Sequence, residues 1–296
     1  MSPSTERLKW PLQAAILCAA TLSLSATPNT GLADEVGRHL YFGIVPQQSA
    51  TRLAKIWVPF MAALSERSGM TIDFATTKDI PTFEACLARG AYELAYMNPY
   101  HYTVFHDASG YRAFARQAEK RLQGLMVVRA DSPVRGLGDL AGKELAFPSP
   151  AAFGASMLPR AEMRRSGILH KPHYVKSHDS VYRSVAAGLF PAGGGVKRTF
   201  AAIDANLRRQ LRVVHETAKY TPHAFASAPG VDDAVRKRIV NAMSAIATEQ
   251  PALVKALGMG GFLASQDADW DDVRALNLSA QDIKIEEVEK TACRSD

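Results

Sequence analysis

Short apolar runs alternate with amphipathic stretches along most of the chain. Short apolar or β-rich runs predict strands at 40–45, 70–75, 91–97, 125–129, 144–147, 173–176 and 211–215, and a Gly-rich run predicts a strand at 192–196. Between them, apolar residues recur every third or fourth position and predict helices at about 49–69, 79–90, 154–166, 178–188 and 231–248. This alternation is typical of βαβ units and predicts a largely parallel sheet.

Local signals mark the ends of the predicted helices. Ser49 is a suitable N-cap for the first helix and Gly69 a suitable stop, whereas Pro59 removes a backbone donor and predicts a kink. Asp232 and Asp233 stand near the positive end of the last long helix.

The predicted elements fall into two blocks. We expect an α/β protein of two lobes, with residues 34–120 and 212–296 in lobe one and residues 121–211 in lobe two. The chain then passes between the lobes twice.

The N-terminus has the pattern of a secretory signal. Arg7 and Lys9 precede an apolar run at 11–26, and Gly31-Leu-Ala33 offers the small residues that a signal peptidase recognises. The apolar run is shorter than the roughly 20 residues that a membrane span needs. The sequence therefore predicts a signal peptide over residues 1–33 and an exported, periplasmic protein.

Composition narrows the function classes only slightly. With 47% hydrophobic and 22% charged residues, the 296-residue chain is neither disordered nor a disulfide-dense scaffold. The net charge of +6 suits an anionic partner. Nucleic-acid binding needs clustered charge, and the basic runs at 164–165 and 236–238 are too short, so we expect no nucleic-acid partner.

Export changes the meaning of the cysteines, because disulfides form outside the cytoplasm. Cys86 and Cys293 follow the predicted cleavage site. A bridge between them and a pair of free thiols are both open from the sequence. Neither cysteine has a second ligand at metal-binding spacing.

Four loops at predicted strand ends lead into helix N-termini: 46–49, 98–100, 149–154 and 177–180. Free backbone N–H groups and the helix dipole make such corners suitable for an oxyanion. Their Ser, Asn and Asp residues also fit simple helix capping. Because these corners recur in both blocks, the sequence favours a ligand cleft between the lobes.

Catalytic and cofactor motifs are weak. Gly154-Ala-Ser156 lacks the second glycine of a nucleophile elbow, and the neighbouring residues His178, Asp179 and Ser180 cannot form a proton relay. No histidine pair has H-E-x-x-H spacing. The glycines Gly193, Gly194 and Gly195 are not followed by the Lys-Ser/Thr of a phosphate loop, and they indicate instead a place where another backbone segment approaches closely. We expect no catalytic residue, no metal and no cofactor.

Three motifs carry a family resemblance: Phe-Gly-Ile-Val-Pro-Gln-Gln-Ser at 42–49, Tyr-Glu-Leu-Ala-Tyr-Met-Asn-Pro-Tyr-His-Tyr at 92–102 and Ser-His-Asp-Ser-Val-Tyr at 177–182. With Leu-Gly-Asp-Leu-Ala-Gly-Lys at 137–143 and Met-Leu-Pro-Arg at 157–160, the chain resembles the periplasmic phosphate/phosphite/phosphonate-binding proteins of ABC transporters. The resemblance implies a type II periplasmic-binding-protein fold whose two lobes close on a ligand and present it to a membrane permease.

The chain departs from the family pattern in two places. Ala152, Phe153 and Gly154 stand where the family has a Ser-Thr-Ser that bonds the oxyanion, so hydroxyl donors are lost while the helix amides remain. Members that bind aminophosphonates place a carboxylate near the stretch that is 190–195 here, which has none. We therefore predict weak binding of aminoalkylphosphonates, since a buried ammonium would be unpaired.

The resemblance and the loops together imply a candidate ligand site for a small oxyanion, which is phosphonate-, phosphite- or phosphate-like. Its residues are Gln48, Ser49, Tyr96, Asn98 and Tyr100 from lobe one, and Ser149, Ala152, Phe153, Gly154, His178, Asp179, Ser180 and Tyr182 from lobe two. His178 is the expected direct donor, and Asp179 caps its helix or orients His178. The matched loops supply no lysine or arginine, so neutral donors are expected to hold the anion.

Two other functions fit the same sequence. A periplasmic sensor would pass ligand occupancy to a membrane histidine kinase in place of a permease. A secreted α/β hydrolase is the more remote alternative, because the chain lacks a recognisable nucleophile motif.

Overall fold

The computed structural model describes residues 39–278 and Cys293. The predicted signal peptide at 1–33 lies outside these residues. No helix in the described ranges combines the length and the apolar character that a bilayer span requires.

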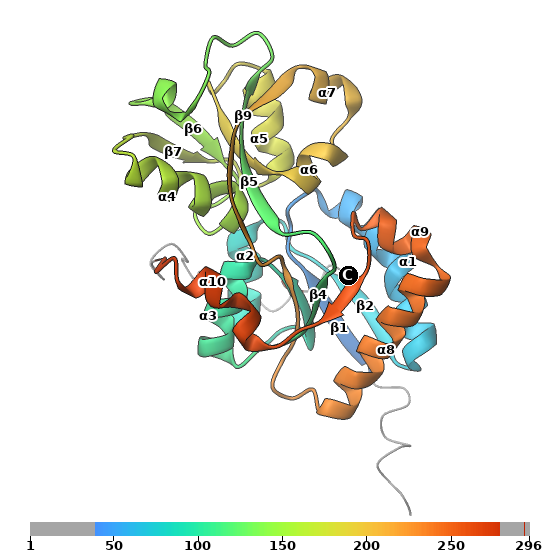
Figure 1. Cartoon of the computed structure of the whole chain (residues 1–296). Helices are drawn as coiled ribbons and strands as arrows, with labels where there is room; N and C mark the ends of the chain where they lie inside the picture. Colours follow the sequence, from blue (N-terminus) through green and yellow to red (C-terminus); the bar gives the residue numbers. More distant parts are fainter. Residues whose placement is uncertain (1–38, 279–292, 294–296) are drawn as a thin grey trace, which may run out of the picture.

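Lobe one is built on a six-stranded sheet (Figure 1). Its strands are β1 (His39–Ile44), β2 (Thr71–Ala75), β3 (Leu94–Met97), β4 (Arg112–Gln117), β10 (Ala224–Ser227) and β11 (Phe262–Ala264), in the order β11-β4-β10-β3-β1-β2. The strands β1, β2 and β3 are parallel, as the alternating pattern predicts, but β10 is antiparallel to both β3 and β4. The sheet is therefore mixed.

Helices cover both faces of this sheet. They are α1 (Ala50–Ser68), α2 (Ile80–Ala88), α3 (Pro99–Ser109), α8 (Asp233–Glu249), α9 (Pro251–Ala256), the 3-10 turn η3 (Asp267–Trp270) and α10 (Asp271–Arg274). The helices α1, α8 and α9 contact one another on one face, and α3 contacts α2 and α10 on the other (Figure 1). Ser49 caps α1, Gly69 ends it in a left-handed conformation, and the helix continues through Pro59.

Lobe two has a five-stranded sheet in the order β7-β6-β8-β5-β9. Its elements are β5 (Leu122–Arg129), η1 (Leu137–Leu140), β6 (Glu144–Phe147), η2 (Phe153–Met157), α4 (Leu158–Arg165), β7 (Lys171–Tyr174), α5 (His178–Ala186), β8 (Gly193–Val196), α6 (Lys197–Ala202), α7 (Ala205–Arg209) and β9 (Leu211–Tyr220). The strands β6, β7 and β8 are parallel, and β5 is antiparallel to both β8 and β9.

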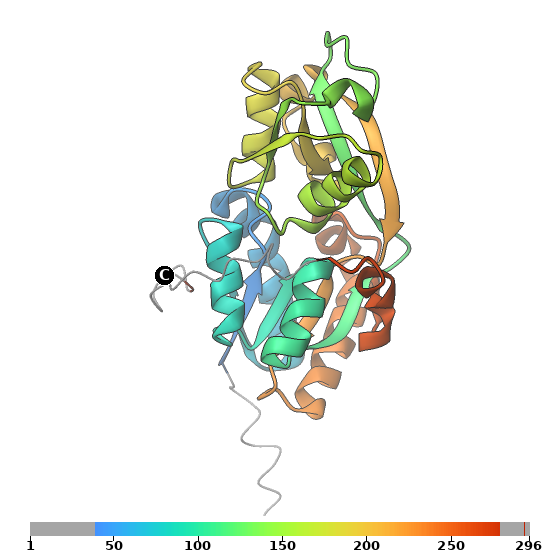
Figure 2. The ribbon, with the colours of Figure 1, turned by 90° about the vertical axis from the view of Figure 1, so that its left-hand side faces the viewer.

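Two connections join the lobes, which lie one above the other (Figure 2). The first lies at 118–121, between β4 and β5. The strand β9 pairs with β5 from Leu211 to Tyr220, so the return to lobe one lies at 221–223, later than the sequence division at 212 suggests.

The largest apolar core runs through lobe one and extends into lobe two. It contains the fully buried rings of Trp57, Phe60 and Phe225, and it also contains Phe153 and Met157 of η2. Two smaller clusters, one around Val181 and one around Met126, complete lobe two. The helical turn η2, which follows β6, is therefore packed between the lobes.

A disulfide joins Cys86 on α2 to Cys293, with the two Cα atoms 5.5 Å apart. This settles the alternative that the sequence leaves open. The bridge links positions separated by 207 residues and holds Cys293 against lobe one.

Replacing both cysteines by serine is expected to lower the free energy of unfolding by about 4–5 kcal/mol, because a long closed loop restricts the unfolded chain. Urea unfolding of C86S/C293S and of the wild type measures the difference. Reduced wild-type protein should unfold at the same urea concentration as the variant. If variant and oxidised wild type share one midpoint, the bridge contributes nothing to stability.

Candidate functional site

The two lobes meet at the loops that follow their central strands. The β1–α1 and β3–α3 loops of lobe one face the β6–η2 and β7–α5 loops of lobe two. The amide of His178 donates to the Gln47 carbonyl at 3.1 Å, and Asn98 Nδ2 donates to the Ala151 carbonyl at 3.0 Å. These bonds bring the corners predicted from the sequence into one interface between the lobes.

The segment 149–157, which we call the amide loop, supplies most of the lobe-two side of this interface. It is buried throughout except for the partly exposed Pro150, and Phe153–Met157 forms one π-helical turn that leads into α4. The first amides of a helical turn have no acceptor within it, so they are available to an anion. Ser149 Oγ and Ser156 Oγ are buried and have no hydrogen-bond partner among the residues that the structure describes.

Glycines in the neighbouring strands allow the amide loop to sit where it does. A Cβ on Gly194 of β8 would lie 1.7 Å from the Ala155 carbonyl oxygen, and one on Gly124 of β5 would lie 2.1 Å from the Gly154 carbonyl oxygen. A side chain at either position would displace the loop backbone. This confirms the close approach that the Gly-rich stretch predicts.

His178 begins α5 and is 2% exposed. Its Nδ1 shares a 3.0 Å hydrogen bond with the Thr199 hydroxyl, which in turn lies 2.8 Å from the Tyr182 hydroxyl. With Nδ1 occupied in this way, Nε2 is the ring nitrogen available to a ligand. Ser177, and not Asp179, caps the helix by accepting from the Ser180 amide, while Asp179 Oδ1 is buried without a partner.

Arg198, at the start of α6, is the main charged group of the interface. Its guanidinium donates to Gln47 Oε1 of lobe one and lies 5.5 Å from the centroid of the Tyr96 ring. Tyr96 stacks on His223 at 4.9 Å, and Gln47 Nε2 lies 3.1 Å from His223 Nε2. Arg198 enters the interface from outside the matched loops, so the interface holds a cation that those loops do not supply.

Burial sets the protonation of the two histidines. Desolvation first, and then the nearby Arg198 charge, lower the pKa of His178 to about 3. Desolvation first, and then the nearby Arg198 charge, hold the pKa of His223 well below its usual range. Both rings are neutral at neutral pH.

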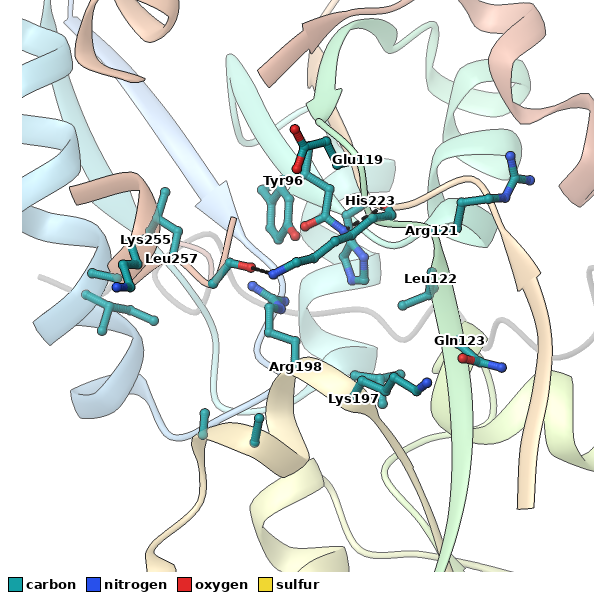
Figure 3. Close-up of a pocket in the computed structure, with 18 of the residues that line it drawn as sticks. Tyr96, Glu119, Arg121, Leu122, Gln123, Lys197, Arg198, His223, Lys255 and Leu257 are labelled. Atoms are coloured by element: carbon teal, nitrogen blue, oxygen red, sulfur yellow. Dashed lines mark hydrogen bonds between the residues drawn. The ribbon is translucent and has the colours of Figure 1, made fainter. Parts of the chain in front are cut away.

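An interlobe cavity of about 840 Å³ opens beside these residues (Figure 3). Gln48, Tyr96, Val196, Arg198 and His223 line its inner part. Gln48 Nε2 is a further buried polar atom without a partner. The cavity and the amide loop are adjacent, because a Cβ on Gly154 would lie 2.6 Å from Val196 Cγ1 and 3.4 Å from Leu122, and both of these side chains line the cavity.

The structure gathers most of the sequence-predicted residues at this interface and leaves others apart. Gln48, Tyr96, Asn98, Ser149, Ala152, Phe153, Gly154 and His178 are buried in or beside it. Ser49 is exposed as the cap of α1, Ser180 serves the cap of α5, and Tyr182 packs beneath Gly195 in the lobe-two core. Tyr100 is buried in α3, directly after the Asn98 cap.

Gln47, Arg198 and His223 were missed. Arg198 follows a strand at a helix start, the same position that marks the other corners, so the sequence holds a signal for it. His223 lies in the connection between β9 and β10, and the sequence pattern does not show where β9 ends and β10 begins. In the described part of the chain, no group of three or more His, Cys, Asp or Glu side chains is arranged to hold a metal ion.

Two α/β lobes with mixed sheets, joined by two connections around a polar interface, define a type II periplasmic-binding-protein fold. The family model for the periplasmic substrate-binding proteins of phosphonate ABC transporters matches residues 42–270. The chain belongs to this family. Its members are transporter substrate-binding proteins and not enzymes, which removes the hydrolase alternative.

Relatives and solved structures agree with this assignment. The chain is 22% identical over 282 residues to the phosphate-import protein PhnD of Mycolicibacterium smegmatis, covering 88% of this chain and 86% of that protein. It is similar in fold to a binding-protein component of a Pseudomonas aeruginosa ABC phosphonate transporter, with a TM-score of 0.73 at 16% identity over 81% of this chain and 86% of that one. PhnD1 of Prochlorococcus marinus, solved with methylphosphonate, gives a TM-score of 0.73 at 15% identity over 81% and 97% of the two chains.

The neutral burial of His178 predicts a pH dependence of stability. Below about pH 6.5 the unfolded protein binds a proton at His178, whereas the folded protein does not until the pH nears 3. The free energy of unfolding is therefore highest above about pH 6.5 and falls as the pH drops towards 3. Between pH 7 and pH 5, the unfolding free energy of the wild type should fall about 2 kcal/mol more than that of H178N. Urea unfolding at several pH values measures the unfolding free energy of both proteins. An equal fall with pH in the wild type and in H178N would contradict the burial of His178 in its neutral form.

Proposed function

We propose that this protein captures a small phosphonate-, phosphite- or phosphate-like oxyanion between its lobes and delivers it to an ABC permease. The observation that carries the proposal is the set of buried polar atoms without partners at the amide loop, namely Ser149 Oγ and Ser156 Oγ. Buried hydroxyl groups that lack a partner are costly, and a ligand oxygen would satisfy them.

The chemistry of the interface suits a single oxyanion. The amides of Phe153, Gly154 and Ala155 are donors at a helix start. Neutral His178 donates from Nε2 in the tautomer in which the Thr199 hydroxyl turns from the Val196 carbonyl and donates to Nδ1. Donors that are already positioned in a water-poor site bind charge strongly because they need little reorganisation. These groups compensate in part for the hydroxyls missing at 152–154.

Groups from both lobes would contact the anion, which links binding to closure. Gln48 and Asn98 come from lobe one, and Ser149 and His178 come from lobe two. A ligand that makes all its contacts only when the lobes meet favours the closed state by its difference in affinity for the two states. Closure of this kind would present a loaded protein to the permease.

The relatives support this ligand class. The Mycolicibacterium smegmatis protein is a phosphate-import protein, and the Prochlorococcus marinus protein was solved with methylphosphonate. Aminoalkylphosphonates remain poor candidates, since Arg198 brings a positive charge to the interface where an ammonium would lie. With the predicted signal peptide, the protein would act in the periplasm.

Two substitutions test the proposed site. Removing one donor to a charged oxygen costs about 1.5–3 kcal/mol, so S149A and H178A should each weaken binding of methylphosphonate or inorganic phosphate roughly 10- to 150-fold. Isothermal titration calorimetry measures the affinity. S244A, which changes an exposed serine on α8, is the matched control and should bind as the wild type does. Full affinity in both site variants would remove the amide loop and His178 from the site.

A further inference from the structure

The interlobe cavity carries a strong excess of positive charge. Six basic side chains line it, Lys120, Arg121, Lys197, Arg198, Lys219 and Lys255, against the single carboxylate of Glu119. A phosphonate head group held by the amide loop does not account for so many cations.

Part of this charge is neutralised and part is not. Arg121 pairs with Asp272, and Lys197 pairs with Glu216 at 2.7 Å. Lys120 Nζ donates to the Gly258 carbonyl at 3.4 Å, which leaves its charge unneutralised. Within the described residues, no carboxylate pairs with Arg198, Lys219 or Lys255. The cavity thus retains a net positive charge after its ion pairs are counted.

The cations come from both lobes. Arg198 on α6 belongs to lobe two, and Lys255 on α9 belongs to lobe one (Figure 3). Lys219 on β9 also belongs to lobe two, and Lys120 lies in the first connection. Like charges brought together by closure repel each other. A negative group between them would relieve that repulsion and favour the closed state.

The cavity is also larger than one oxyanion requires. Water takes up about 30 Å³ per molecule in the liquid, so a five-atom oxyanion fills only a small fraction of about 840 Å³. Pockets of this size hold organic molecules with many more atoms. Leu122, Leu257 and the Tyr96 ring offer apolar surface to a carbon chain.

We propose that the ligand carries a second anionic group, joined by a short carbon chain to the phosphonate or phosphate head. This rests on the proposed function, which places the head group at the amide loop. The second group, a carboxylate in the simplest case, lies in the interlobe cavity near Arg198, Lys219 and Lys255. Arg198 lies between the two parts of the site, since it contacts Gln47 and Tyr96 and its charge acts on His178.

Three compounds with one head group test this specificity. Calorimetry on the full-length mature protein compares 3-phosphonopropionate, propylphosphonate and 2-aminoethylphosphonate. We expect 3-phosphonopropionate to bind about tenfold or more tightly than propylphosphonate, with 2-aminoethylphosphonate the weakest. The preference should shrink as salt is added, because part of it comes from exposed lysines.

A double variant locates the second group. K219Q/K255Q should lower the affinity for 3-phosphonopropionate to near that for propylphosphonate and leave propylphosphonate binding unchanged. K171Q/K237Q removes the same charge from exposed positions on β7 and α8 and should behave as the wild type does.

The outcomes separate the two proposals. Equal affinity for propylphosphonate and 3-phosphonopropionate, tighter binding of the amino compound, or an unchanged preference in K219Q/K255Q overturns the second anionic group and leaves the oxyanion site standing. If none of the three compounds binds, the proposed function fails and this inference fails with it.

Discussion

The close approach of strand β8 to the amide loop is the constraint on which the interface depends. The Ala155 carbonyl lies where a Cβ of Gly194 would be, and the Gly154 carbonyl lies where a Cβ of Gly124 would be. The backbone of the amide loop is therefore in direct contact with these strands. The π-helical turn also packs into the apolar core that it shares with lobe one. The amides at its start are thereby fixed between the lobes.

Burial also decides the electrostatics of the interface. His178 and His223 remain neutral because desolvation disfavours their charged forms, and the nearby Arg198 adds to that effect. Arg198 is bonded to Gln47 and placed over the Tyr96 ring. The anion-binding chemistry therefore has two parts, oriented neutral donors at the amide loop and a cationic cavity beside it.

Local patterns predicted much of the fold. Periodicity and capping signals placed α1 between Ser49 and Gly69, and alternation separated the two lobes. The antiparallel strand β10 was missed, because the short run Ala-Phe-Ala-Ser gains its place only by pairing with β3 and β4, far away in sequence. The π-helical turn was missed as well, and it packs against β5 and β8, which are distant from it in sequence.

The candidate site shows the same division between local and non-local information. Residues that follow strands and lead into helical turns, such as Asn98 and Ser149, could be placed from sequence because the rule for such corners is local. Arg198 and His223 could not be brought together in that way, because their meeting depends on how the lobes close.

A crystal structure of the protein with methylphosphonate tests the central claim most directly. The account predicts that the phosphorus lies between the lobes, with its oxygens within hydrogen-bond distance of the Phe153–Ala155 amides and His178 Nε2. Phosphorus bound elsewhere on the protein, with these groups making no contact to it, would contradict the account.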